Sequence, residues 1–314
     1  MSEVDESKFP YGYVPEHLKE RVKNWRSLSV GERLELTSEL SSAAWAKIGV
    51  VRDPSKPMDK TIRRAERSRV SIVLDEAEVA SIIRFLGFGR ASANVWFVGL
   101  EEGLGDMTSD EARENIKQRA HFSEIMDLRE AHLRLKEKGQ TIDVEVNTPK
   151  TAVWKWMARI VLLLKGAADW NDPISIKQYV RFHLGRANGE TFLTELSPIP
   201  SRNRADDCWP HWFKTRDLNL EKQLQERKAK LKQMIAEYSR SLIICYGLSR
   251  ADEFAELLGV EWEYKTSKIG CAKDGARWLL PFFGTGQMSV ATFGEFASLI
   301  RGSSAANTDK SSRA

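Results

Sequence analysis

The sequence predicts an α/β protein of three layers, in which helices cover both faces of a mostly parallel four-stranded sheet, with a helical extension before it. Short apolar runs typical of buried strands alternate with amphipathic helical segments, which is the order of a covered parallel sheet. Each run is followed by a loop of glycine, proline or polar residues, and the functional sites of open α/β sheets lie at such loops. With 314 residues, the chain is long enough for such a core.

Residues 1–90 are predicted to form the helical extension. Ser29 precedes one helical stretch, and Asp75 can cap another that stops at Gly87. The prolines of segment 53–57 mark a break between the two. This part is therefore expected to be an arm or subdomain.

The predicted α/β domain covers residues 91–301, and the small polar residues of 302–314 predict a disordered tail. Its strands are the apolar runs 94–98, 191–196, 242–246 and 278–283. Its main helices are predicted at 151–164, 218–238, 251–258 and 290–300. Residues 262–264 could add an edge strand, and Pro281 favours an edge or bulge for the last strand.

The positive charges are clustered. The net charge of +4 and the pI near 8.8 permit a polyanionic partner without requiring one. Arg63, Arg64 and Arg67 lie in a basic cluster at 56–69 that could bind DNA phosphates. The basic residues of 222–232 fit the solvated face of an amphipathic helix better.

Several classes of protein lack their sequence signals. Three scattered cysteines are typical of a reducing compartment, and neither a signal peptide nor a membrane-spanning run is apparent, so we expect a cytoplasmic protein without a membrane partner. Cys208 and His211 have a spacing compatible with zinc, but a closed site needs about four ligands, so no metal is expected. Phosphate-binding glycine motifs are lacking, so no cofactor is expected. We expect a monomer.

Polar residues follow each strand, and the carboxyl ends of parallel strands meet at one edge of the sheet. Glu101 and Glu102 follow the first strand in a glycine-rich loop, Glu195 ends the second, Tyr246 ends the third before Gly247, and loop 285–289 follows the fourth. These residues are expected to share one cleft. Alternatively, the acids of the first loop begin the next helix, where they would complement the helix dipole.

The order of these loops over residues 92–300 resembles the uracil-DNA glycosylase superfamily. Segment 99–103 resembles the water-activating loop of that family, with Glu101 where some members have a catalytic Asp. Glu195 stands where many members use an Asn to recognise the base. Segment 284–289 resembles the loop that grips DNA or the leaving base.

The chain departs from the family at three points: Glu102 replaces a proline, Glu195 replaces the Asn, and no His begins the last loop. The resemblance therefore implies a DNA glycosylase for an atypical or modified base rather than for uracil. A carboxylate can stabilise the cationic sugar and orient water, which assigns Glu101, with Glu102 as competitor, to catalysis. An ionised Glu195 would accept a hydrogen bond from the exocyclic amine of a cytosine-like base. Both DNA repair and defence against phages with modified DNA are compatible roles.

A flipped base needs further contacts. Trp209 could stack on it, and His211 could replace the missing family His. Met288 is the candidate wedge, although a lone Met more often packs in a core. The remaining candidate DNA contacts are Arg202, Thr285, Gln287 and Ser289.

Two other functions stay open from the sequence. The same cleft could hydrolyse free nucleosides or nucleotides, in which case salt would change binding little. The departures from the family motifs are also compatible with an inactive module that binds nucleic acid.

Overall fold

The computed structural model describes residues 14–24, 27–29, 32, 35–36, 39–40, 74–103, 109–137, 139–146, 151–168, 170–198, 219–238, 241–284 and 286–311. The chain divides into two compact units, Met1–Arg67 and Ser68–Ala314. The predicted boundary at residue 90 falls inside the second unit, because the segment before it supplies helix α4 (Glu76–Arg84) and strand β1 (Gly87–Gly89), which pairs with the sheet.

In the first unit, the structure describes helix α1 (Glu16–Lys23), as expected for a helical part of the chain. Leu18 of this helix is buried with Val14 and Leu36 in a small apolar cluster. The cluster of Arg63, Arg64 and Arg67 lies outside the described residues. Their proposed contact with DNA stays a prediction.

The second unit contains an eight-stranded sheet in the order β3-β1-β6-β2-β7-β10-β9-β8. The strands are β1, β2 (Val95–Gly99), β3 (Ile125–Met126), β6 (Thr191–Glu195), β7 (Leu242–Tyr246), β8 (Glu263–Thr266), β9 (Ile269–Cys271) and β10 (Arg277–Leu280). Neighbours in the central group β6-β2-β7-β10 are parallel, and these are the four predicted strands. The α/β class is confirmed, whereas the number of four strands is wrong.

The additional strands are short and lack a clear apolar pattern. β1 reads Gly87-Phe88-Gly89, and Gly89 has φ +101°. A Cβ at Gly89 would lie 2.2 Å from the carbonyl oxygen of Thr191, so only glycine lets β1 approach β6 this closely. β1 is parallel to β3 and antiparallel to β6, and β9 pairs antiparallel with both β10 and β8. Pairing with the sheet, rather than the local sequence, makes these segments strands.

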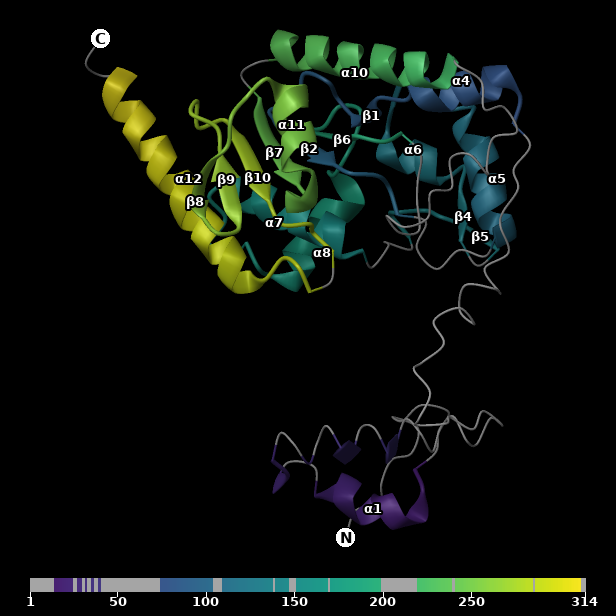
Figure 1. Ribbon diagram of the computed structural model, residues 1–314, viewed down its shortest axis with the longest axis vertical. Coiled ribbons are helices and arrows are strands. Elements are labelled where there is room, and N and C mark those ends of the chain that lie inside the picture. The colour runs from purple at the N-terminus through teal and green to yellow at the C-terminus, as the bar shows by residue number, and fades with distance from the viewer. Residues whose placement is uncertain are drawn as a thin grey trace. The chain divides into compact units, whose positions relative to one another are not determined.

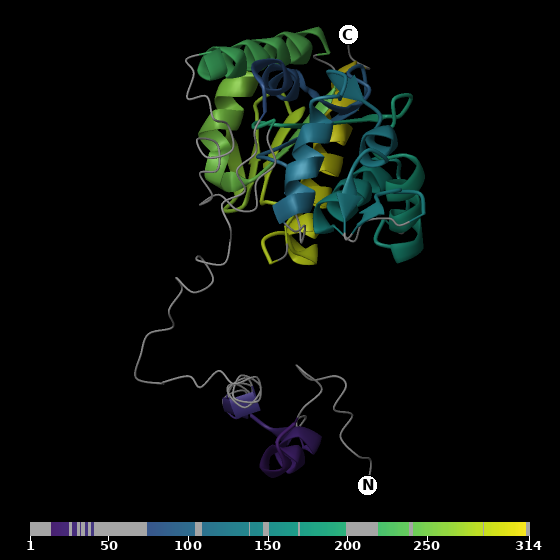
Figure 2. The ribbon, with the colours of Figure 1, turned by 90° about the vertical axis from the view of Figure 1, so that its right-hand side faces the viewer.

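Helices cover both faces of the sheet (Figures 1 and 2). Alternate residues of β2 show the two faces: Val95 and Phe97 belong to one apolar cluster, and Trp96 and Val98 to the other. The helices of the first cluster are α6 (Leu128–His132), α7 (Ala152–Leu164), α8 (Pro173–Phe182) and α12 (Val290–Ser311). Those of the second are α10 (Asn219–Glu237) and α11 (Ala251–Leu258). The remaining described elements are α5 (Ser109–Arg119), the 3-10 helix η4 (Leu248–Arg250) and the separate hairpin of β4 (Lys136–Glu137) and β5 (Gln140–Thr141).

The helix ends follow the local sequence closely. Asp75 forms a capping box with Glu78 at the start of α4, and α11 ends at Gly259 in the left-handed conformation. α12 continues to Ser311, into the segment 302–314 for which the sequence predicts a disordered tail. β10 ends at Leu280, directly before Pro281, which has no N–H to donate to a sheet.

Among the described residues, the length and apolar character that a bilayer span requires are not combined in any helix. In the same part of the chain, no three His, Cys, Asp or Glu side chains gather as a metal site would require.

Candidate functional site

A cavity of about 630 Å³ opens at the carboxyl ends of the parallel strands. Its polar wall includes Glu101, Glu102, Arg119, His132, Glu195 and Tyr246. Its apolar wall includes Phe85, Phe88, Trp154, Met157 and Phe282. The structure thus brings together the acidic residues predicted in two separate loops.

The floor of the cavity is formed by Glu195 and Tyr246, which lie on the two parallel strands that flank β2. Gly99 of β2 pairs with Glu195 of β6, and Tyr246 of β7 lies at the same level, one residue after the pair Val98–Cys245. The Tyr246 hydroxyl donates to Glu195 Oε1 at 2.9 Å. A Cβ on Gly99 would lie 1.9 Å from Glu195 Oε2 and 2.3 Å from the Tyr246 hydroxyl. Glycine on the middle strand therefore lets the two outer side chains meet.

The surroundings of the Glu195 carboxyl group favour its protonated form. Burial raises its pKa to about 8, against the opposing effect of the Tyr246 hydrogen bond, and the nearby charges of Glu102 and Glu101 raise it as well. Oε2 is buried and has no hydrogen-bond partner among the described residues. The sequence predicts an ionised Glu195, whereas these surroundings disfavour the charged form.

Arg227 lies behind this floor and fixes the strand ends. Its guanidinium donates to the carbonyl oxygens of Phe85, Leu196 and Glu195 at 2.9, 3.0 and 2.9 Å. The side chain is buried, and burial lowers its pKa to about 10. Arg227 thus positions the loop after β6 and does not belong to the solvated face predicted for its helix.

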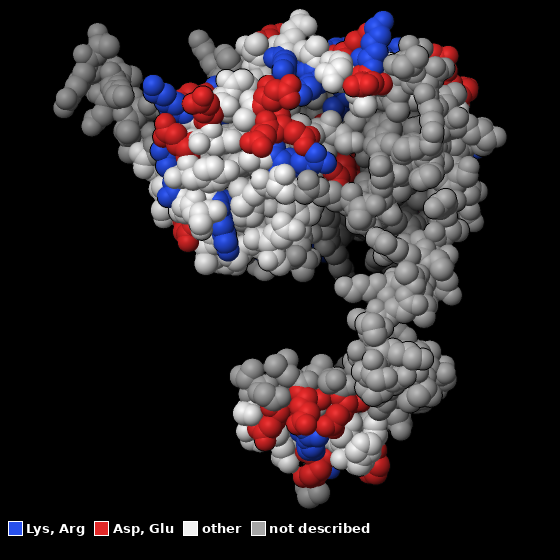
Figure 3. Space-filling view, viewed as in Figure 1, with Lys and Arg blue, Asp and Glu red and all other residues white. Residues whose placement is uncertain are grey.

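The lysines of α10 do lie on a solvated face. Lys228 and Lys230 pair with Glu256 and Glu124, each at 2.6 Å. Lys222 pairs with Glu226 at 3.8 Å, and Lys232 also pairs with Glu256, at 3.6 Å. Figure 3 shows basic and acidic side chains side by side over this part of the surface.

The first acidic loop contributes two carboxylates to the cavity. Glu102 Oε2 lies 2.7 Å from a terminal guanidinium nitrogen of the buried Arg119. Glu101 lines this cavity and also a smaller one of about 280 Å³, which lies against α10 and α11. Neither Glu101 nor Glu102 is helical. The alternative that the acids of this loop begin the next helix is therefore wrong for these two, and Asp106 of the same loop lies outside the described residues.

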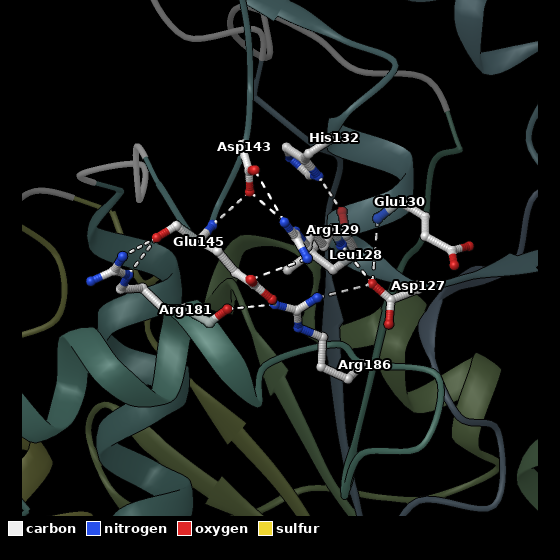
Figure 4. Close-up of polar contacts among 9 residues, drawn as sticks. All are labelled: Asp127, Leu128, Arg129, Glu130, His132, Asp143, Glu145, Arg181 and Arg186. Carbon is white, nitrogen blue, oxygen red and sulfur yellow. Dashed lines mark hydrogen bonds and ion pairs between the residues drawn. The ribbon is translucent and has the colours of Figure 1, made fainter.

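His132 adds a nitrogen to the cavity wall. Its Nδ1 lies 2.8 Å from the carbonyl oxygen of Leu128, one turn earlier in α6 (Figure 4). Burial lowers its pKa, so the ring is neutral at pH 7. Because a carbonyl only accepts, the proton is on Nδ1 and the lone pair is on Nε2.

The described residues of the last predicted loop, 286–289, do not line the cavity. Met288 is buried in the core cluster, so it packs in the protein rather than projecting as a wedge. Ser289 Oγ accepts from the backbone N–H of Thr292 and caps α12. Gln287 is exposed, and it does not line the cavity. Only Phe282 of the described residues after β10 contributes to the wall.

Four other candidate residues cannot be placed. Arg202, Trp209, His211 and Thr285 lie outside the described residues. Their suggested contacts with the base or with DNA stay predictions.

Tyr246, which ends the third predicted strand, was expected at this cleft and lines the cavity beside Glu195. The sequence reasoning missed three other residues of the site. Arg119, His132 and Arg227 carry no comparable signal, because they lie on helices far from the strand ends in sequence. Their place in the site results from the packing of these helices.

Comparison of the chain with protein-family models, with curated proteins and with solved structures finds no match.

Proposed function

We propose that the protein is a DNA glycosylase, which hydrolyses the N-glycosidic bond of a modified, cytosine-like base flipped into the cavity. The observation that carries this proposal is the presence of two kinds of carboxyl group at one cavity. Glu102 lies 2.7 Å from a guanidinium nitrogen of Arg119, whereas Glu195 has no such cation beside its carboxyl group and burial raises its pKa to about 8. Divided environments of this kind are how enzymes separate a base from an acid.

Each carboxyl group has one role in the proposed hydrolysis. Water adds to C1′ of the sugar as the bond from C1′ to the base nitrogen breaks. Glu101 or Glu102 stabilises the developing cation and takes the proton from water. The departing base leaves with the electron pair of the broken bond, and protonated Glu195 can return a proton to it. The reaction consumes one water and needs no redox partner.

Glu195 in its protonated form also explains how it could replace an amide. A carboxylic acid combines an O–H donor with a C=O acceptor, and the amide of Asn likewise combines N–H donors with a C=O acceptor. A carboxylate only accepts hydrogen bonds. The position that an Asn occupies in the resembled superfamily is thus filled by a group with similar hydrogen-bonding capacity. This supports recognition of a base by the floor of the cavity.

The size of the cavity supports a modified base. A bare pyrimidine of about eight non-hydrogen atoms fills less than roughly 240 Å³, even at the roughly 30 Å³ that a water takes in the liquid. The cavity of about 630 Å³ leaves room for a bulky substituent or for the sugar. Modified cytosines in phage DNA meet this description, and defence against such phages is the biological role we propose.

One observation favours a second candidate, a hydrolase of free nucleosides. The described lysines of α10 are paired with acids, so they are not available as a basic track for DNA. Salt separates the two candidates. The rate of base release from DNA should fall steeply as the salt concentration rises, whereas the rate of nucleoside hydrolysis should change little.

The test is release of base from duplex and single-stranded oligonucleotides that carry cytosine, its modified forms or uracil. Substitution of the catalytic carboxylate, Glu101→Gln or Glu102→Gln, should lower the rate by about 10²–10⁴. Glu130→Gln is the matched control, since Glu130 is exposed on α6 and should leave the rate unchanged. Absence of any abasic product, with DNA binding retained, would instead support an inactive binding module.

A further inference from the structure

His132 is held in one tautomer and one orientation. The Leu128 carbonyl accepts from Nδ1, so the proton cannot move to Nε2 without loss of this bond. The ring packs against two aromatic side chains, Phe88 at 5.9 Å and Trp154 at 5.1 Å between ring centroids. A ring flip would have to break the hydrogen bond and disturb this packing.

Nε2 is an acceptor without a partner among the described residues. His132 is 5% exposed, and it lines the cavity together with Glu102 and Glu195. The charged groups that act on the ring are Glu102 and Arg119, which have opposite effects and are paired with each other. Since Nε2 carries a lone pair, a ligand N–H that reaches it can donate a hydrogen bond to it.

We infer that His132 determines specificity in this cavity, by accepting a hydrogen bond at Nε2 from an amino group of the bound base. This inference rests on the proposed function, since it assumes that the ligand is a nucleobase. The fixed acceptor at His132 and the O–H donor of Glu195 are complementary to the amino group and the ring N3 of cytosine. Uracil presents a carbonyl and an N–H at these two places, so both contacts would be reversed.

The test measures binding of the free bases cytosine and uracil to the full chain, without turnover. Cytosine should bind about tenfold more tightly than uracil, since one matched hydrogen bond contributes about that factor. Cytosine should also shift the ¹⁵N resonance of His132 Nε2, whereas uracil should not. The resonance reports the hydrogen bond itself and would not move if His132 were only structural.

Two substitutions separate the two ring nitrogens. His132→Asn keeps an amide donor near the Leu128 carbonyl but removes the group at Nε2, so the preference for cytosine should be lost. His132→Gln places an amide near Nε2 and should restore part of the preference. Thermal unfolding of both variants shows whether a lost preference comes from a damaged fold.

The outcomes distinguish this inference from the proposed function. If cytosine is preferred through His132 but no substrate is hydrolysed, the glycosylase proposal fails and the inference survives as base binding. If base is released from DNA while His132→Asn leaves the preference unchanged, the inference alone fails. Equal binding of both bases, or binding of neither, also overturns it.

Discussion

Two polar regions of the α/β unit place their carboxyl groups in opposite electrostatic surroundings. The first, which we call the Arg186 cluster, joins α6, α8 and the segment after β5 (Figure 4). Its members are Asp127, Arg129, Asp143, Glu145, Arg181 and Arg186. Arg186 contacts Glu145 at 2.7 Å and Asp127 at 3.3 Å, and Arg129 contacts Asp143 at 3.2 Å. The second region is the cavity floor, where Glu195 meets a hydroxyl and a glycine instead of a cation.

The pKa values show what this difference does. The hydrogen bond from Arg129 lowers the pKa of Asp143, whereas burial raises the pKa of Glu195 to about 8. A carboxylate that meets guanidinium groups is stabilised in its charged form and joins segments of the fold. One that is buried without a cation can exchange a proton near neutral pH, as acid–base chemistry requires.

The largest effect is expected from Glu195→Gln. Between about pH 4.5 and pH 8 the folded protein keeps a proton that the unfolded chain loses, so wild-type stability should fall as the pH rises through this window. The variant cannot ionise and should lack this decline, with a difference of a few kcal/mol above pH 8. Denaturant unfolding at about pH 5 and about pH 9 measures it. Parallel pH dependence in both proteins would show that Glu195 is ionised like an exposed acid.

Gly99→Ala tests the geometry of the floor. The added Cβ would overlap Glu195 Oε2, so we expect a loss of about 1–3 kcal/mol in the free energy of unfolding. Gly103→Ala is the matched control, since nothing described lies within 4 Å of a Cβ there, and it should change stability by less than about 0.5 kcal/mol. Equal losses in the two variants would contradict the close approach over Gly99.

Tyr246→Phe should have a smaller effect, of about 1 kcal/mol, because it removes one hydrogen bond and keeps the ring stacked on Phe283. The bond lowers the pKa of Glu195, so its loss should raise that pKa further. Direct titration of the Glu195 carboxyl by NMR measures the shift. Tyr264→Phe, at an exposed position of β8, is the control and should leave the pKa of Glu195 unchanged.

Asp143→Asn should change stability least. The pKa of Asp143 is lowered in the fold, so its contribution is present above the usual value of 3.8 and is lost as the pH falls. The ion pair is partly exposed, so salt should weaken it. Unfolding at low and high salt measures this, and a salt-independent effect larger than that of Tyr246→Phe would reverse the ranking.

The local sequence was a good guide to the centre of the fold. The four apolar runs are the four parallel strands, since continuous apolar residues suit a strand buried on both faces. The helices α7, α10 and α11 lie within two residues of their predicted bounds. The edge strand β8 lies where residues 262–264 suggested one, whereas β1, β3 and β9 were not predicted, because segments such as Gly87–Gly89 become strands only through their partners.

The site, like the fold, was determined in part by the local sequence and in part by the tertiary structure. The sequence by itself determined which acids stand at the strand ends, because strand direction places residues such as Glu102 and Glu195 at one edge of a parallel sheet. Only the tertiary structure decided their chemical states, because a pKa depends on burial and on neighbours brought from elsewhere in the chain. Arg119 joins Glu102, whereas Tyr246 and the bare backbone of Gly99 enclose Glu195, which therefore keeps its proton.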